Sequence, residues 1–297
     1  MNDRRAHALP GPLLFAAGLL LSAAAGAAED RFAEVVVTHE EVRENLYMLQ
    51  GAGGNIGLLV TDEGVLMVDD QYAPLAERIE AKIDELAGAR PRFVLNTHFH
   101  GDHTGGNPFF GREGTILAHE NVRSRLVAGG MEAAGLPVIT YADRVRVHLG
   151  GETVDLLHAP NGHTDGDSFV FFREANVVHL GDEFFFGRFP YVDLQSGGSV
   201  AGLTANIADA LAQVDADTRI IPGHGPLATA ADLAAYLEML RATHDLVADA
   251  VASGATDEEI HARGLGARWA SWGEGFVSTE RWIDTLLAEL RMGAGGR

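Results

Sequence analysis

Residues 96–106, NTHFHGDHTGG, constrain the fold of this chain more than any other stretch. Three histidines and one aspartate fall within six residues, directly after RFVLNT, which is typical of a short buried strand. Histidines at i and i+2 on a loop can aim at one point, as His98 and His100 do here. Asp102 and His103 follow on the next turn and can aim at a second point. Because neutral imidazole and carboxylate are good zinc ligands, the stretch predicts the start of two adjacent metal sites.

Three further candidate ligands stand at the ends of other predicted strands. His163 lies in the turn NGHTDGD, Asp182 follows the strand in VVHLGDEFF, and His224 stands between glycines in IIPGHGP. Small neighbours allow a bulky ligand to reach a buried centre. A carboxylate can bridge two metals because it has two oxygens. We therefore assign the ligands as follows: His98, His100 and His163 to one metal; Asp102, His103 and His224 to the other; Asp182 between them.

Such a site predicts hydrolytic chemistry. Two cations lower the pKa of a bridging water towards neutrality, and the resulting hydroxide attacks a carbonyl carbon. Asp102 is the candidate catalytic residue, because it can both ligate a metal and orient the nucleophile. We expect two Zn²⁺ ions, although the same nitrogen and oxygen ligands also accept iron or manganese.

The outer parts of the site are less sharply defined by the sequence. Asp69 ends the run LMVDD and is a candidate to hold a ligand histidine from behind, or else an ordinary aspartate at a strand end. Arg188 and Tyr191, in EFFFGRFPYVD, are candidates to contact the substrate, the alternative being a core strand with a surface turn. The stretch RWASWGEGF, around Trp269 and Trp272, could cover the pocket, but tryptophans near a carboxyl terminus are more typical of residues that pin a helix.

The sequence predicts two halves with a similar pattern of strands and helices. Strands are expected at 33–39, 46–50, 55–61, 64–70 and 92–97, then at 145–149, 154–158, 168–172, 177–180 and 218–221. Helices are expected at 73–87 and 200–214, with two or three more closing the chain, one of them capped by Thr229 and Asp232. Strands followed by a helix, twice over, favour two packed sheets with helices outside, in one domain.

Residues 1–28 are typical of a secretory signal. Arg4 and Arg5 precede a short apolar run, and small residues allow cleavage near Ala27 or Ala28. An uncleaved anchor is the alternative. We expect residues 29–297 to form a periplasmic or secreted catalytic domain with C-terminal helices and no stable membrane span. The net charge of −20 argues against nucleic acid, so the expected partner is a small-molecule substrate.

The motifs THFHGDH, GHT, GD and PGHG, in this order, resemble the metallo-β-lactamase superfamily. The resemblance covers the chain from about residue 35 to the His224 loop and the helix after it. It implies an α/β fold, the αββα four-layer sandwich, with a di-metal site at one edge of the sheets. It also implies a zinc hydrolase that opens a cyclic amide, an ester or a thioester.

Within that superfamily the match is mixed. The β-lactamases that these motifs resemble carry Cys where Asp182 stands and Arg where His103 stands. Their substrate-binding lysine corresponds to Phe185, and Arg188 is a candidate to replace it. The ligand set here resembles that of glyoxalase II-like thioesterases and lactonases. Two alternatives remain at this point: an iron-based oxidoreductase on the same fold, and a non-catalytic periplasmic metal-binding accessory protein.

Overall fold

The structure, a computed structural model, describes residues 31–295. The predicted signal segment, residues 1–28, lies outside the described residues. By its contacts the chain divides into a unit of residues 1–35 and a unit of residues 36–297. All helices and strands named below belong to the second unit. None of the helices within the described range is long and apolar enough to cross a membrane.

The first sheet has seven strands in the order in which they occur in the chain. They are β1 (Thr38–Arg43), β2 (Leu46–Gln50), β3 (Ile56–Thr61), β4 (Gly64–Val68), β5 (Pro91–Leu95), β6 (Thr115–His119) and β7 (Ile139–Tyr141). The first four strands are antiparallel, and β4 to β7 run parallel. Parallel neighbours need a crossover, which α2 (Ala76–Ala87) and α5 (Glu120–Ala128) provide.

The second sheet has six strands. They are β8 (Arg144–Leu149), β9 (Glu152–His158), β10 (Ser168–Phe172), β11 (Val177–His179), β12 (Arg219–Ile221) and β13 (Ala228–Thr229). Only β11 and β12 run parallel, and α6 (Val200–Leu211) is the crossover between them. Because the carboxyl ends of parallel strands meet at one edge, the residues that follow β11 and β12 lie together.

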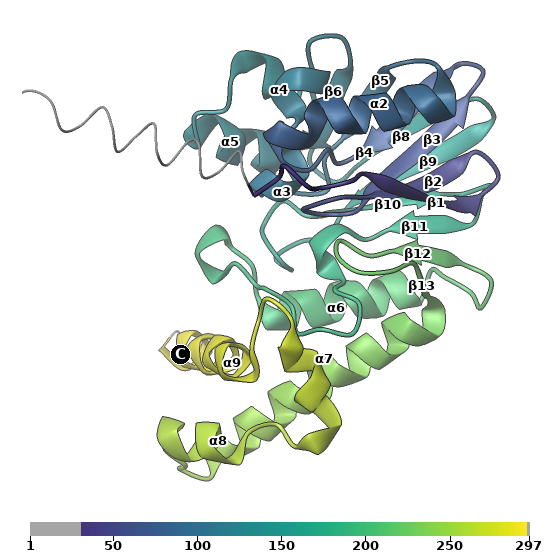
Figure 1. The fold of residues 1–297 in the computed structure, drawn as a ribbon. Coiled ribbons are helices and arrows are strands. Elements are labelled where there is room, and N and C mark those ends of the chain that lie inside the picture. Colours follow the sequence, from purple (N-terminus) through teal and green to yellow (C-terminus); the bar gives the residue numbers. More distant parts are fainter. Residues whose placement is uncertain (1–30, 296–297) are drawn as a thin grey trace, which may run out of the picture. The chain divides into compact units, whose positions relative to one another are not determined.

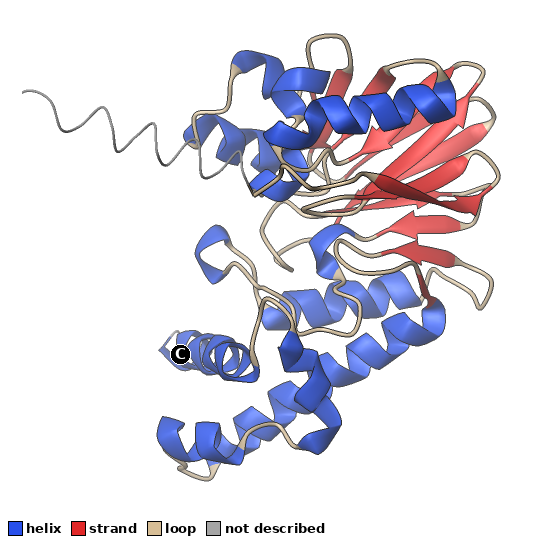
Figure 2. Ribbon diagram, viewed as in Figure 1, coloured by secondary structure: helices blue, strands red, loops and turns tan. Residues whose placement is uncertain are grey.

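The two sheets pack face to face, with helices on both outer sides. Figures 1 and 2 show α2, α4 (Asn107–Phe110) and α5 on one side, and α6 and α7 (Ala230–Ala252) on the other. Buried side chains from both sheets, among them Met48, Leu66 and Leu156, form the core between them. The predicted αββα sandwich is confirmed.

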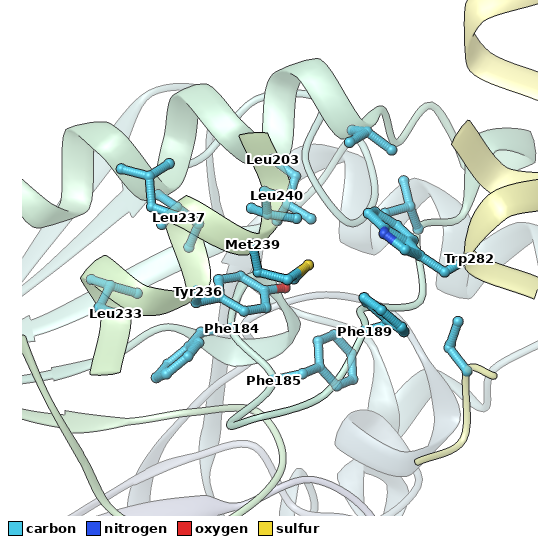
Figure 3. Packing of buried hydrophobic residues seen from close by; sticks show 14 of the residues in the cluster. Phe184, Phe185, Phe189, Leu203, Leu233, Tyr236, Leu237, Met239, Leu240 and Trp282 are labelled. Atoms are coloured by element: carbon cyan, nitrogen blue, oxygen red, sulfur yellow. The ribbon is translucent and has the colours of Figure 1, made fainter. Parts of the chain in front are cut away.

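The chain closes with helices that build a second core. They are α7, α8 (Asp257–Arg263), the 3-10 segment η5 (Ala267–Glu274) and α9 (Thr279–Gly295). The predicted capping box at Thr229 and Asp232 is present at the start of α7. Figure 3 shows Phe184, Phe189, Tyr236 and Trp282 packed together in this core. It fixes α9 to the body of the protein.

Several predicted element boundaries were wrong. The first strand begins at Thr38 rather than at residue 33. The strands β6 and β7 were not predicted: TILAH is a short apolar run without alternation, and β7 has only three residues. The helix predicted at 200–214 ends at Leu211. The helix predicted at 73–87 begins with a 3-10 turn, η1 (Ala73–Leu75), which contains Pro74.

Candidate metal centre

Four connections bring the predicted ligands to one edge of the two sheets. The loop after β5 enters the short helix α3 (Gly101–Thr104) and carries the first four ligands. The turn between β9 and β10 carries His163. Asp182 lies in a 3-10 turn, η3 (Gly181–Glu183), after β11, and His224 follows β12. Chain segments about 120 residues apart therefore meet at one place.

The first group consists of His98, His100, His163 and Asp182. One possible ligand atom from each lies within 4.8 Å of the others. His163 Nε2 is 2.8 Å from His100 Nδ1, and Asp182 Oδ2 is 3.6 Å from His163 Nε2. Asp182 Oδ2 also lies 3.8 Å from His98 Nε2. These atoms surround one point, as the sequence predicted for the first metal.

The second group consists of Asp102, His103 and His224. His224 Nε2 lies 3.3 Å from Asp102 Oδ2 and 3.5 Å from His103 Nε2. Asp182 reaches this group with its other oxygen, because Oδ1 is 3.1 Å from His103 Nε2 and 3.3 Å from His224 Nε2. One oxygen of Asp182 therefore faces each group, which is the position of a bridging ligand.

The outer nitrogen of each first-group histidine is already used. His163 Nδ1 donates to the Tyr191 carbonyl at 2.7 Å. His100 Nε2 donates to Asp193 Oδ2 at 3.2 Å. His98 Nδ1 lies 3.1 Å from Thr97 Oγ1, which itself donates to Asp69. In a neutral ring whose outer nitrogen donates, the inner nitrogen is an acceptor, and the inner nitrogens of His163 and His100 face each other.

The positions of the inner histidine nitrogens show whether a metal ion would fit between them. Two facing acceptors 2.8 Å apart repel each other unless a cation or a proton lies near both. The inner nitrogen of His98 is buried and has no hydrogen-bond partner. A buried polar atom without a partner is costly, and a bound cation would satisfy it. The two clusters of histidine and aspartate are thus consistent with a binuclear metal site.

Asp69 lies directly behind the ligands and is fully buried. It has φ of 62°, a strained value that turns the chain sharply after β4. Its carboxylate accepts from His103 Nδ1 at 2.7 Å, and from Thr97 N and Oγ1 at 2.8 and 2.7 Å. Asp69 therefore holds His103 directly and His98 through Thr97. Fixing the orientation of ligand rings in this way is a common need of metal sites.

The histidines of the two groups differ in the direction of their pKa shifts. Burial lowers the pKa of His98 well below its usual value, so this ring is neutral. Burial also acts on His103, but the carboxylates of Asp182, Asp102 and Asp69 outweigh it and raise the pKa well above the usual range. The same competition raises the pKa of His224 to about 9. The second group therefore attracts positive charge strongly.

Glycines make room for the ligands at two close approaches. A Cβ at Gly54 would overlap the ring of His103, and a Cβ at Gly223 would overlap Asp182 Oδ1. Any larger residue at either position would push a ligand away from the centre. The glycine-rich loop after β2 and the glycine before His224 are therefore part of the site.

The ligands open into a cleft of about 580 Å³. Arg188 and Tyr191, the two predicted substrate contacts, line it. So does Phe276, the last residue of the stretch RWASWGEGF that was expected to cover the pocket. Val277 and Arg281, which no sequence signal marked, line it as well. Trp269 and Trp272 do not line it, and they pack against each other and the core, as the helix-pinning alternative predicts.

Two more functional residues were missed by sequence reasoning. Asp193 holds His100, and Glu183 Oε1 accepts from the His163 backbone N at 2.9 Å. Glu183 is buried next to Asp182 in the quoted motif, so its position beside a ligand was the only available signal. Nothing in the sequence around Asp193 links it to His100.

Comparisons with known proteins are consistent with this geometry. A family model described as Metallo-beta-lactamase superfamily matches residues 49–224. A protein named Hydroxyacylglutathione hydrolase, from Anaeromyxobacter dehalogenans (strain 2CP-C), is 30% identical over 184 residues. The alignment covers 61% of this chain and 62% of that protein, so the chain spans about three fifths of this relative's length.

Solved structures show the same fold. A metallo-beta-lactamase from Pontibacter korlensis superposes with a TM-score of 0.60 at 16% identity, over 69% of this chain and 99% of that one. The sec-alkyl sulfatase PisA1, as a double mutant, superposes with a TM-score of 0.71 at 13% identity, over 86% of this chain and 50% of that one. At such identities the likeness concerns the fold alone.

Proposed function

The chain belongs to the metallo-beta-lactamase superfamily, and on this basis we propose that it is an exported zinc hydrolase of cyclic amides, esters or thioesters. At the coarser level it is a metallo-hydrolase with a di-metal site of histidine and aspartate side chains. The observation that carries the proposal is Asp182, because its two oxygens face the two ligand groups separately.

Esters and thioesters are the substrates that the ligand set favours. The position that carries cysteine in the β-lactamases these motifs resemble is Asp182 here, and the relative with 30% identity is named for a hydroxyacylglutathione. Phe185 stands where those β-lactamases place a lysine, and its ring stacks on His224 at 5.4 Å. An apolar ring there favours an uncharged acyl group close to the metals.

The residues of the site divide the work of hydrolysis. When bound, two divalent cations supply an activated water and polarise the carbonyl of the substrate. Asp102 is partly exposed to the cleft, and its Oδ2 lies 3.3 Å from His224 Nε2. We assign it to orient the attacking water and to take up its proton. His103, held by Asp69, keeps its geometry during the reaction because its outer nitrogen is fixed.

A panel assay tests the proposal. Protein loaded with zinc would be offered nitrocefin, a lactone and a thioester, and metal content would be measured on the same sample. We expect about two zinc ions per chain and turnover that a chelator abolishes. Undiminished turnover after Asp102→Ala would contradict the mechanism, and iron with oxygen consumption would contradict zinc hydrolysis.

Export has its own test. The proposal predicts that full-length protein is cleaved near Ala27 or Ala28 when it is produced in a bacterium with a periplasm. Sequencing the amino terminus of the periplasmic protein would detect that cleavage. Intact residues 1–28 on a cytoplasmic product would refute export without affecting the proposed chemistry.

A further inference from the structure

We propose that Asn55 and His179 are positioning residues for the metal that the second group of ligands holds. The inference rests on the proposed function, because it assumes that both ligand groups bind a cation. Neither side chain is a candidate ligand, and both are buried, with exposed fractions of 4% and 0%. Buried polar side chains need hydrogen-bond partners, and the partners of these two are backbone groups beside two of the ligands.

Asn55 holds the loop that carries His224. Its backbone N donates to the Gly223 carbonyl at 2.7 Å. Its side-chain Nδ2 donates to the carbonyls of Pro222 and Gly225, both at 2.9 Å. An amide nitrogen carries two protons, so both are used. Three carbonyls around His224 therefore accept hydrogen bonds from a single residue.

His179 holds the turn that carries Asp182. It is the last residue of β11, and its Nδ1 accepts from the Gly181 backbone N at 3.1 Å. Its Nε2 donates to the Asn55 carbonyl at 3.0 Å. A neutral imidazole has one donor and one acceptor nitrogen, so these two bonds fix both the tautomer and the orientation of the ring.

The two residues belong to a closed ring of four hydrogen bonds. The fourth bond runs from Gly223 N to the Gly181 carbonyl at 2.7 Å. The members of the ring are, in order, Gly223, Asn55, His179 and Gly181. Each of the two glycines directly precedes a ligand in the chain. The ring therefore fixes the distance between those two ligands.

That distance matters more for the second group than for the first. Asp182 Oδ1 lies 3.3 Å from His224 Nε2, and both atoms face the second group. The histidines of the first group lie outside the ring, and their outer nitrogens contact Thr97, Asp193 and the Tyr191 carbonyl. Opening the ring should therefore weaken metal binding at the second group and largely spare the first.

The ring also joins the two sheets, so its role in stability must be separated from its role at the metal. Asn55 directly precedes β3 of the first sheet, whereas His179 ends β11 of the second. A Cβ on Gly57 of β3 would lie 3.3 Å from His179 Cδ2, so the imidazole packs closely against that strand. A merely structural role would lower stability without favouring one metal site over the other.

His119 is a matched control for His179. It is 3% exposed, its Nε2 donates to the Ala142 carbonyl at 2.8 Å, and its Nδ1 accepts from Asn121 N at 3.2 Å. The two histidines therefore share their burial, their tautomer and the kinds of their partners. However, neither Ala142 nor Asn121 adjoins a candidate ligand in the chain.

Zinc affinity and stability are compared in His179→Phe, His119→Phe and His179→Gln. Zinc titration in competition with a chromophoric chelator gives the affinities of the two sites, and thermal unfolding of chelator-treated protein gives the stability. We expect both phenylalanine variants to have a lower melting temperature, but only His179→Phe to bind one of the two zinc ions about ten- to hundredfold more weakly. Glutamine offers one donor and one acceptor, so His179→Gln should restore part of that affinity. If His179→Phe does not fold, Asn55→Ala gives the same comparison, because it removes the side-chain bonds and leaves the ring closed by its backbone bond.

Anomalous diffraction from crystals of His179→Phe at limiting zinc identifies the weakened site. The inference predicts a full peak at the first group of ligands and a reduced peak at the second. Equal losses at both groups would overturn it, as would an equal loss of zinc affinity in His119→Phe. None of these measurements needs turnover, so absence of hydrolysis would refute the proposed function alone. Failure of the unmodified protein to bind zinc at the second group would refute the inference.

Discussion

The floor of the cleft and its C-terminal wall are built in opposite ways. The floor, which we define as the seven candidate ligands, is mostly buried, and its histidines are held by carboxylates, a hydroxyl or a backbone carbonyl. The C-terminal wall consists of Phe276, Val277 and Arg281. Phe276 and Arg281 are exposed, Val277 is buried, and the guanidinium group of Arg281 lies against the rings of Phe276 and Tyr191. A rigid, polar floor suits chemistry that needs fixed geometry, while an open wall suits the choice of substrate. The comparison predicts that the two regions can be damaged separately.

Loss of Asp182 should have the largest effect, because it serves both halves of the floor. We expect Asp182→Ala to reduce kcat/KM on the order of 10³-fold, beyond the ten- to hundredfold typical of residues behind the ligands, and to lower the zinc content. Metal analysis and kinetics on the same sample measure this. Asp245→Asn, at an exposed aspartate of α7, is the matched control. Full zinc content in Asp182→Ala would show that Asp182 is not a metal ligand.

Trp282→Ala should damage the wall and spare the floor. Removing a fully buried tryptophan costs about 3–5 kcal/mol of unfolding free energy. We expect a lower melting temperature and an altered substrate preference, with two zinc ions still bound. Trp282→Phe should do the same to a smaller degree if the alanine variant does not fold. Loss of zinc from a folded Trp282 variant would show that floor and wall are not separate.

Asp69 and Asp70 are neighbours in the chain that are not ligands themselves, and they offer a second comparison. Asp69 accepts from a ligand ring, whereas Asp70 accepts from backbone N–H groups, among them that of Gly106 at 2.8 Å from Oδ1. Asp69→Asn should weaken zinc binding by about ten- to hundredfold, because the amide cannot hold His103 in the same way. Asp70→Asn keeps its acceptor oxygen and should weaken binding much less. Competition with a chromophoric chelator measures both, and equal losses would contradict the assigned role of Asp69.

The smallest predicted effect is a pH dependence of the metal-free protein. Burial lowers the pKa of His224, but the carboxylates of Asp182 and Asp102 outweigh burial and raise this pKa from 6.5 to about 9. A raised pKa in the folded state adds stability that is complete below pH 6.5 and is lost as the pH rises through about 9. We expect the unfolding free energy of chelator-treated protein to fall by about 1–3 kcal/mol between pH 6.5 and 9. In His224→Asn the unfolding free energy should depend less on pH. An equally steep decrease in the variant would show that another group causes the pH dependence.

The sequence could predict the floor because each ligand carries a local signal. His98, His163 and His224 all follow strands, glycines adjoin the last two, and the order of their motifs indicates the fold. The wall gives no such signal. Arg281 is brought near Tyr191 by tertiary packing of α9, such as the stacking of Trp282 on Phe189, a contact between residues 93 positions apart. Asp193 was missed for the same reason, since a loop conformation alone brings it to His100.

The most direct test of the central claim is a crystal structure of the zinc-loaded protein with anomalous data at the zinc edge. The account predicts two peaks on either side of Asp182, within about 2.0–2.2 Å of its oxygens or of the inner histidine nitrogens. One peak should lie among His98, His100 and His163, and the other among Asp102, His103 and His224. A single peak, or two peaks away from these atoms, would contradict the account.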